Sequence, residues 1–249
     1  MEDFLKLALL VPIGMVAGFL NITAGGGSLL ALPFLIFLGL PPTVANGTNR
    51  VAILVQNIFA TTRFHKFAVI PKEITFITTI PAVVGAIGGA QMAVQIDELL
   101  FKRLLAVVMI LVMGFMFFGR GSTQRQTALN LTSMKKLLIA VAFFAIGVYG
   151  GFIQGGIGFL LITALTLTGY DLVKTNALKV LVVLIFTPFA LAIFIWHGQV
   201  DFLKGFILAI GNGAGAWVAS RVVVEKGHNF VRWIVMATVV VFAVKLFWG

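Results

Sequence analysis

Two cationic residues, Arg50 and Lys179, lie inside long apolar stretches of this sequence without a neighbouring carboxylate. Asn46, Asn49 and Arg50 are spaced at i, i+3 and i+4, which places them on one face of a helix. Asn176 and Lys179 repeat the i, i+3 spacing in the second half. Unpaired cations in an apolar environment are costly and point to a functional site. With neutral amide donors beside them, they predict an anion-binding site.

The acidic residues support an anion rather than a cation as the ligand. All eight carboxylates fall near the ends of apolar stretches or between them: Glu2, Asp3, Glu73, Asp97, Glu98, Asp171, Asp201 and Glu225. No acid is therefore expected to neutralise the two cations inside the apolar layer. The alternative is that Arg50 and Lys179 extend their side chains to the nearer membrane surface and bind nothing.

Two glycine-rich clusters could contribute backbone donors to the same site. The candidate residues are Gly25, Gly26, Gly27 and Ser28 in the first half, Gly156 and Gly158 in the second, and the amides Asn21 and Gln154 just before each cluster. A helix that begins at such a cluster presents free N–H groups and partial positive charge to an oxyanion. The alternative is close helix packing through small residues.

The composition requires a membrane environment for these residues. Of 249 residues, 60% are hydrophobic and only 10% are charged, against about 25% charged in soluble domains. Ten apolar runs follow one another, and most are long enough to span a bilayer: 4–24, 28–40, 43–62, 73–95, 99–118, 135–154, 157–169, 174–196, 202–222 and 230–248. The second run of each set of five is too short to span upright and follows a glycine cluster. Broken helices at matching positions are typical of transporter binding sites.

A weak internal repeat at an offset near 130 relates the two sets of five runs. Gly85 and Gly89, for example, correspond to Gly211 and Gly215. We therefore expect a first membrane repeat at 1–119, a central cytoplasmic linker at 120–134 and a second repeat at 135–249. The predicted fold is an all-α polytopic membrane protein of about ten transmembrane segments, arranged as two five-segment repeats.

The distribution of Lys and Arg predicts the orientation. Counted over alternate sides of ten segments, eleven of these cations fall on one side and five on the other. The richer side should be cytoplasmic, which places both termini in the periplasm. An odd number of crossings in each half makes the two repeats inverted. This holds whether the short segments span fully or turn back within the membrane.

Several other classes of function are excluded. The net charge of +10 is explained by cytoplasmic loops rather than by nucleic-acid binding. The chain has no cysteine, and its three histidines lack metal-ligand spacing, so neither a metal nor a cofactor is expected. No combination of nucleophile, base and orienting residue is present, and an enzyme is not predicted.

Three features together resemble the sulfite exporter TauE/SafE family of small bacterial membrane permeases. They are the glycine-rich break at 25–28, the segment Leu38-Gly39-Leu40 followed by Pro41-Pro42-Thr43-Val44-Ala45-Asn46-Gly47-Thr48-Asn49, and the half-chain repeat. The resemblance covers nearly the whole chain and is better in the first half. It implies transport of a small sulfur-containing or organic anion, such as sulfite or sulfoacetate, across the bacterial inner membrane. The second half departs from the pattern, with Ile157 in place of a glycine and Lys179 aligned with Asn49.

The sequence thus predicts a secondary transporter that exports sulfite or an organosulfonate by alternating access. The anion would lie between the two glycine breaks, neutralised by Arg50 and Lys179. An anion channel with the same pore residues and a non-transporting membrane subunit are the alternatives. The partners expected are the anion and the lipid bilayer, and the oligomeric state is not predicted.

Overall fold

The computed structural model describes residues 7–66, 72–118, 132–166 and 172–223, and this part of the chain contains helices and no strands. The helices are α2 (Leu10–Thr23), α3 (Ser28–Phe37), α4 (Pro42–Phe64), α5 (Lys72–Gln95), α6 (Glu98–Phe118), α7 (Ser133–Phe152), α8 (Ile157–Thr166), α9 (Leu172–Trp196) and Phe202–Val223, which is called the final helix below because it is the last one described. Nine of the ten predicted apolar runs are therefore helical. The tenth run, 230–248, and most of the predicted linker lie outside the described residues.

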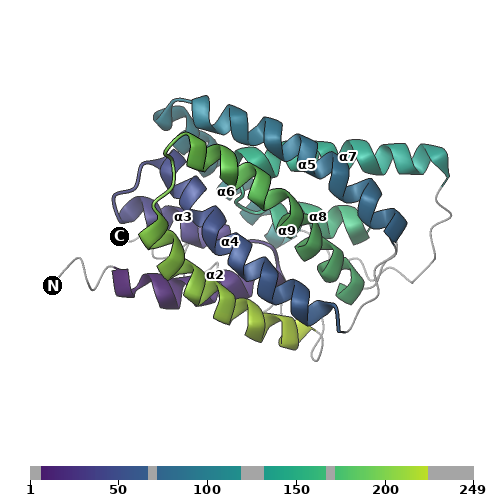
Figure 1. Ribbon diagram of the computed structural model, residues 1–249, viewed down its shortest axis with the longest axis horizontal. Helices are drawn as coiled ribbons and strands as arrows, with labels where there is room; N and C mark the ends of the chain where they lie inside the picture. Colours follow the sequence, from purple (N-terminus) through teal and green to yellow (C-terminus); the bar gives the residue numbers. More distant parts are fainter. Residues whose placement is uncertain (1–6, 67–71, 119–131, 167–171, 224–249) are drawn as a thin grey trace.

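Two helical hairpins turn back in the middle of the molecule, one in each half of the chain (Figure 1). The chain breaks between α2 and α3 at Gly25, and between α7 and α8 at Gly156, where φ is +80° and +77°. Glycine is the residue that adopts this left-handed conformation at no steric cost. Residues of α3 pack back along α2, and residues of α8 pack back along α7. The short helices are thus the return arms of hairpins.

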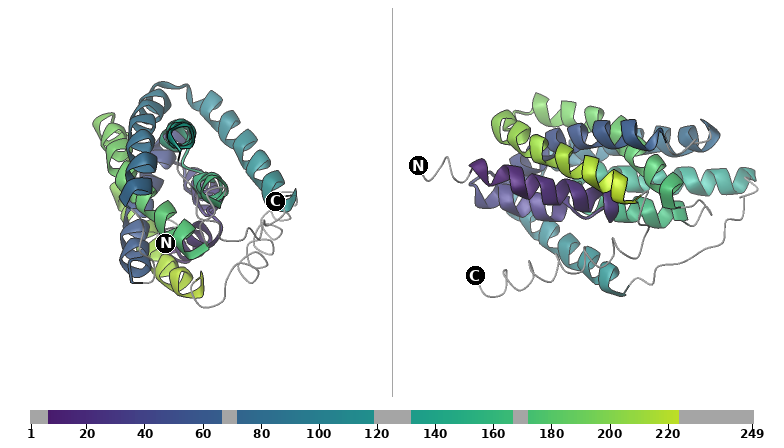
Figure 2. Two further views of the ribbon diagram at one scale, coloured as in Figure 1. Left: turned by 90° about the vertical axis from the view of Figure 1, so that its right-hand side faces the viewer. Right: turned by 90° about the horizontal axis from the view of Figure 1, so that it is seen from below.

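The two hairpins enter from opposite ends of the molecule. Figure 2 shows α2 and α3 together at one end, and α7 and α8 toward the other. The long helices α4 and α9 cross the middle in opposite directions, packed against each other (Figure 1). Of the described helices, α5, α7, α9 and Phe202–Val223 are long and apolar enough to cross a membrane.

Glycines fasten each hairpin to a helix from the other half of the chain. A Cβ on Gly89 of α5 would lie 2.0 Å from the Val148 carbonyl oxygen of α7, and one on Gly215 would lie 1.9 Å from the Met15 carbonyl oxygen of α2. Both contacts are between backbones, so no side chain fits there. Gly85, Gly89, Gly211 and Gly215 are therefore packing glycines, and the contacts in α2 and α7 are made by Gly14, Gly18, Gly147 and Gly151. A packing role was also expected for Gly88 and Gly213, but a Cβ on Gly88 would meet nothing within 4 Å, so that expectation is wrong for Gly88.

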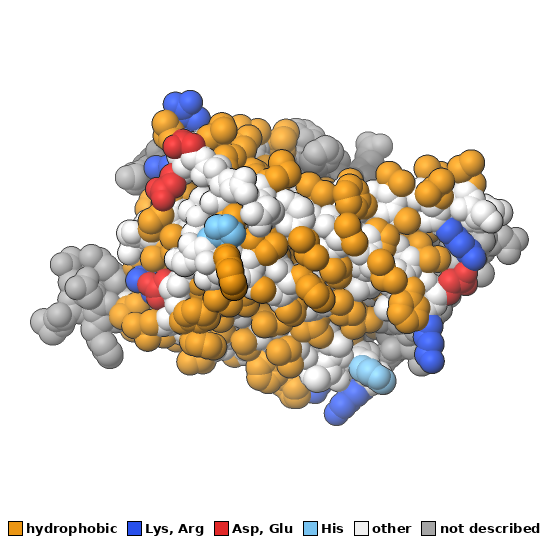
Figure 3. Space-filling view, turned by 45° about the horizontal axis from the view of Figure 1, so that its top comes forward, with side chains coloured by type: hydrophobic (Ala, Val, Ile, Leu, Met, Phe, Trp, Pro, Cys, Tyr) orange, Lys and Arg blue, Asp and Glu red, His pale blue; other side chains and the backbone are white. Residues whose placement is uncertain are grey.

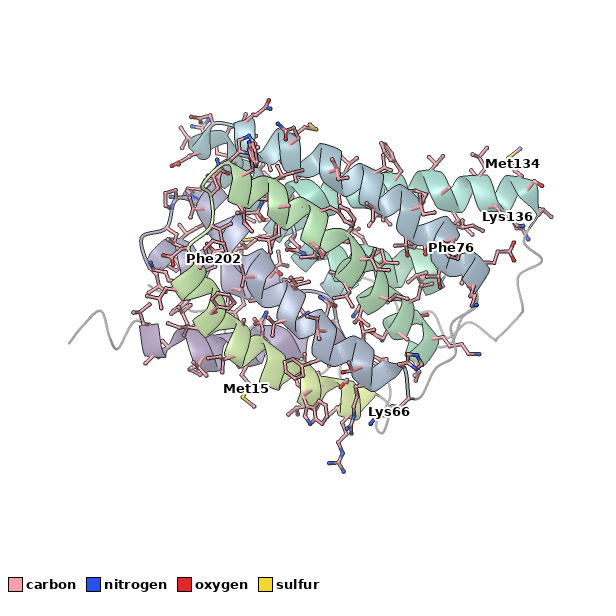
Figure 4. The ribbon with its side chains drawn as sticks, in the orientation of Figure 1. Met15, Lys66, Phe76, Met134, Lys136 and Phe202 are labelled. Atoms are coloured by element: carbon pink, nitrogen blue, oxygen red, sulfur yellow. The ribbon has the colours of Figure 1, made fainter. Side chains whose placement is uncertain are left out.

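The surface has the pattern of a protein that crosses a bilayer. Figure 3 shows a broad hydrophobic face with charged side chains gathered at the two ends. Lys66 and Lys136 mark one end, with Phe76 near Lys136, and Phe202 lies toward the other end, while Met15 points outward from the helices (Figure 4). Among described residues, the first end holds Arg63, Lys66, Lys72, Lys135, Lys136, Lys174 and Arg221, and the second holds Lys102, Arg103 and Lys204. The cation asymmetry expected from the sequence is therefore present.

Candidate functional site

The two glycine breaks meet, backbone against backbone, in the centre of the molecule. A Cβ added to Gly25 would lie 2.1 Å from the carbonyl carbon of Gly158, and one added to Gly158 would lie 2.4 Å from the Cα of Gly25. These residues are 133 positions apart and belong to different hairpins. The turn of each hairpin is thus in contact with the other.

A small polar cavity adjoins this contact. Its volume is about 20 Å³, enough for about one water molecule. It is lined by Asn21, Ser28, Ile53, Gln56, Asn57, Gln154, Ile157, Gly158, Lys179 and Val183. Six of these ten residues are polar, although the surrounding helices are mostly apolar. Polar side chains buried among apolar helices are costly to maintain, and they mark a place where a polar ligand can bind.

The first break is held by a chain of amide side chains. The backbone N–H of Ser28 donates to Asn21 Oδ1 at 3.1 Å, and Asn21 Nδ2 in turn donates to Gln56 Oε1 at 3.0 Å. Asn212 Nδ2, from the final helix, also donates to Gln56 Oε1 at 3.3 Å. Asn49 Nδ2 donates to Ser28 Oγ at 3.1 Å from behind. The start of α3 is therefore connected to α4 and to the final helix.

Arg50 lies at the carboxyl-terminal end of α7. Its Nη1 donates to the Gly150 carbonyl at 3.1 Å and its Nη2 to the Gly151 carbonyl at 2.5 Å, while its guanidinium stacks 4.6 Å from the Phe194 ring centre. Asn46 Nδ2 donates to the Phe152 carbonyl at 2.8 Å. The last carbonyls of a helix have no intrahelical donor. Arg50 and Asn46 supply these donors from α4, and both are fully buried.

Lys179 has the corresponding position at the end of α2. Its Nζ donates to the Asn21 carbonyl at 3.1 Å, the Ile22 carbonyl at 2.7 Å and Asn176 Oδ1 at 2.7 Å. An ammonium group has three N–H donors, and these acceptors match them in number. Each cation thus caps the first hairpin helix of the opposite half. Lys179 also lines the cavity, whereas Arg50 does not.

The structure brings the predicted site residues together in two groups. Asn21, Ser28, Gln154, Gly158 and Lys179 line the cavity. The others surround the breaks without lining it: Gly25, Gly26, Gly27 and Gly156 form the turns, while Arg50, Asn46, Asn49 and Asn176 bond to hairpin ends or to the first group. The snorkelling alternative does not fit Arg50 or Lys179, whose donors are directed to buried carbonyls.

The predicted site did not include the cavity residues Gln56 and Asn57, or two further polar residues of this region. Asn212 joins the network through Gln56, and Thr187 Oγ1 accepts from Gln154 Nε2 at 3.2 Å. Both are fully buried. Each is an isolated polar residue in an apolar run, Asn212 between two glycines and Thr187 before a proline. That isolation was the available signal. No cluster of three metal-binding side chains occurs within the described ranges.

The chain resembles a family and several curated proteins along nearly its whole length. The family model described as "Sulfite exporter TauE/SafE" matches residues 10–246. A "Probable membrane transporter protein" of Haemophilus influenzae is 29% identical over 91% of this chain and 88% of its own length. "Probable membrane transporter protein YfcA" of Escherichia coli K12 is 29% identical over 97% and 90%, respectively. "Probable membrane transporter protein ORF9" of a Sinorhizobium species is 24% identical over 99% and 95%. No solved structure matches the chain.

Proposed function

This chain belongs to the sulfite exporter TauE/SafE family of membrane transporters, and from that premise we propose that it exports a small sulfur-containing anion. Sulfite is the first candidate substrate, and an organosulfonate such as sulfoacetate is the second. The observation that carries the proposal is the contact between Gly25 and Gly158 beside a polar cavity. Substrate sites between broken helices of two repeats are a recurring transporter design.

The proposed site favours an anion through the ends of its four hairpin helices. The amino-terminal ends of α3 and α8 carry partial positive charge, and the carboxyl-terminal ends of α2 and α7 carry partial negative charge. Lys179 and Arg50 bond to the latter two ends. Their charges offset the negative helix ends, so the positive ends of α3 and α8 are left to act on the anion.

Binding and transport would require the hairpins to separate. A sulfite ion, with one sulfur and three oxygens, is larger than the single water molecule that a cavity of about 20 Å³ holds. We infer inverted repeats at 1–119 and 135–249, joined by the linker 120–134. Rocking of the two hairpins about their meeting point would open the cavity to one side and then to the other. Both termini would be periplasmic and the protein would lie in the inner membrane.

The test is a thermal-shift and calorimetric titration of the purified protein with sulfite, sulfoacetate, sulfate, thiosulfate and chloride. Stabilisation by a ligand follows RT ln(1 + [L]/Kd), so even a modest affinity is measurable at millimolar anion. We expect a selective response to sulfite or sulfoacetate that is lost in Lys179→Met. The matched control is Lys102→Met, which removes the same charge from an exposed position.

Sulfite binding in Lys179→Met with the parent affinity would contradict the proposed site. Reconstituted vesicles then distinguish a transporter from a channel. A transporter gives saturable sulfite efflux, whereas unitary anion currents would replace this proposal with the channel.

A further inference from the structure

Four buried amide side chains around the breaks donate hydrogen bonds through their nitrogen atoms, but their carbonyl oxygens accept none. Asn46, Asn49 and Asn212 each donate a hydrogen bond through Nδ2, and Gln154 donates through Nε2. The carbonyl oxygens of all four side chains are buried without a partner. A buried acceptor without a donor is costly, by about 1–3 kcal/mol. Among these four residues, only Gln154 lines the central cavity.

The hydrogen-bond network determines which end of the Gln154 amide is unpaired. Thr187 Oγ1 donates its own proton to the Val183 carbonyl at 2.6 Å, so toward Gln154 this oxygen can only accept. Gln154 must therefore present Nε2 to Thr187, at 3.2 Å, and its Oε1 is left over. The side chain is only 1% exposed, so bulk water does not pair with it.

The same reasoning determines the orientation of the Gln56 amide, which lies near the first break. The Ser28 N–H fixes Asn21 with Oδ1 toward Ser28, and Asn21 Nδ2 then fixes Gln56 with Oε1 toward Asn21. Gln56 lines the cavity and keeps Nε2 as the group it can offer. The residues that line the cavity thus include one with a donor to offer, Gln56, and two with an acceptor to offer, Gln154 and Asn57, whose Nδ2 donates to the Ile53 carbonyl at 2.7 Å.

We propose that this site selects an anion that itself carries a hydrogen-bond donor, which pairs with Gln154 Oε1. The inference rests on the proposed function and narrows its substrate class to hydrogen-bearing anions, such as hydrogensulfite or a hydroxylated sulfonate. The fully deprotonated sulfite dianion has no proton to give to Gln154. A site built to bond a donor discriminates strongly against analogues that lack one, because its own polar group is then left unpaired.

The test compares two isosteric monoanions, hydroxymethanesulfonate and ethanesulfonate, which differ by a hydroxyl in place of a methyl. Both keep the same charge at one fixed pH, so titration of Lys179, the ionisable residue among those lining the cavity, does not affect the comparison. We expect calorimetry to show that hydroxymethanesulfonate binds about tenfold more tightly or better. Sulfite is included as the reference ligand.

Two variants test whether the Gln154 amide causes this preference. Gln154→Met removes the acceptor at similar volume, and Thr187→Val keeps Gln154 but releases the orientation of its amide. Both should reduce the preference for hydroxymethanesulfonate to near unity. The inference is overturned if the parent protein binds the two monoanions equally, or if the preference persists in Gln154→Met. In either case, sulfite binding by the parent protein leaves the proposed function standing. Absence of binding by every anion, sulfite included, overturns the proposed function itself.

Discussion

Arg50 and Lys179 show how a buried cation can be stabilised without a carboxylate. Both are almost fully buried, and each bonds to two carbonyls at the end of a helix, where the partial negative charge of that helix is concentrated. A residue in this position stabilises the protein before any substrate binds. A residue that only neutralises a substrate contributes nothing to the stability of the substrate-free protein.

This difference leads to the prediction that Arg50→Met lowers the melting temperature of the protein in anion-free detergent. The Gly150 and Gly151 carbonyls lose their donors, and each unpaired acceptor costs about 1–3 kcal/mol. Arg103→Met, at an exposed position, should stay within about 0.5 kcal/mol of the parent. A normal melting temperature for Arg50→Met with anion binding lost would instead mean that Arg50 acts on the substrate alone.

The lowered pKa of Asp201 predicts that the protein loses stability at acid pH. Burial by itself would raise the pKa of this carboxyl, but hydrogen bonds from the Lys204 side chain and backbone, with the charge of Lys204, lower the pKa below 3.8. The carboxylate caps the final helix, so its contribution is complete above pH 3.8 and is lost as the pH falls through the lower folded pKa. Asp201→Asn keeps a capping oxygen that does not titrate.

The measurement is the melting temperature of the parent and of Asp201→Asn from neutral pH down to about pH 3. The melting temperature of the parent should exceed that of the variant near neutral pH, and this difference should shrink only at the acid end of the range. An advantage that is constant across this range would show that the Asp201 charge contributes nothing to folding.

At the scale of helices, the glycines of α5 offer a matched pair of substitutions. Gly89→Ala places a methyl 2.0 Å from the Val148 carbonyl oxygen, whereas Gly88 of the same helix has open space around its Cβ position. We expect Gly89→Ala to destabilise the protein by about 1–3 kcal/mol through overpacking. Gly88→Ala should be neutral or stabilise it by up to about 1 kcal/mol through helix propensity. Equal melting temperatures for the two variants would contradict the tight α5–α7 contact.

The helices were predictable from the sequence because apolar runs and glycine clusters are local signals. The run 43–62 became α4 (Pro42–Phe64), and the breaks formed where glycines cluster. The partners of the cations were not predictable, because Arg50 bonds to Gly150 and Lys179 to Asn21 across 100 and 158 positions. Hydropathy also cannot distinguish a short spanning helix from the return arm of a hairpin. Only the packing of α3 along α2 and of α8 along α7 establishes that these helices turn back.

At the scale of the whole molecule, the two halves interlock rather than pack as separate bodies. The first hairpin is joined to the final helix of the second half through Gly14, Gly18, Gly211 and Gly215, and the second hairpin to α5 through the corresponding glycines. Arg50 and Lys179 connect the two halves in the same way, because each caps a hairpin helix of the opposite half. Neither hairpin would keep its helix end satisfied without the opposite half. The site therefore depends on both halves at once.

The cation asymmetry between the two ends predicts which end faces the cytoplasm. The end marked by Lys66 carries seven Lys and Arg among described residues and the other end carries three. Because the chain contains no cysteine, Lys66→Cys and Lys102→Cys each introduce a single thiol at one end. An impermeant thiol reagent should label Lys102→Cys in intact spheroplasts and Lys66→Cys only in inside-out vesicles. The reverse pattern would invert the orientation, and labelling of both variants from one side would contradict a chain that separates these ends across the membrane.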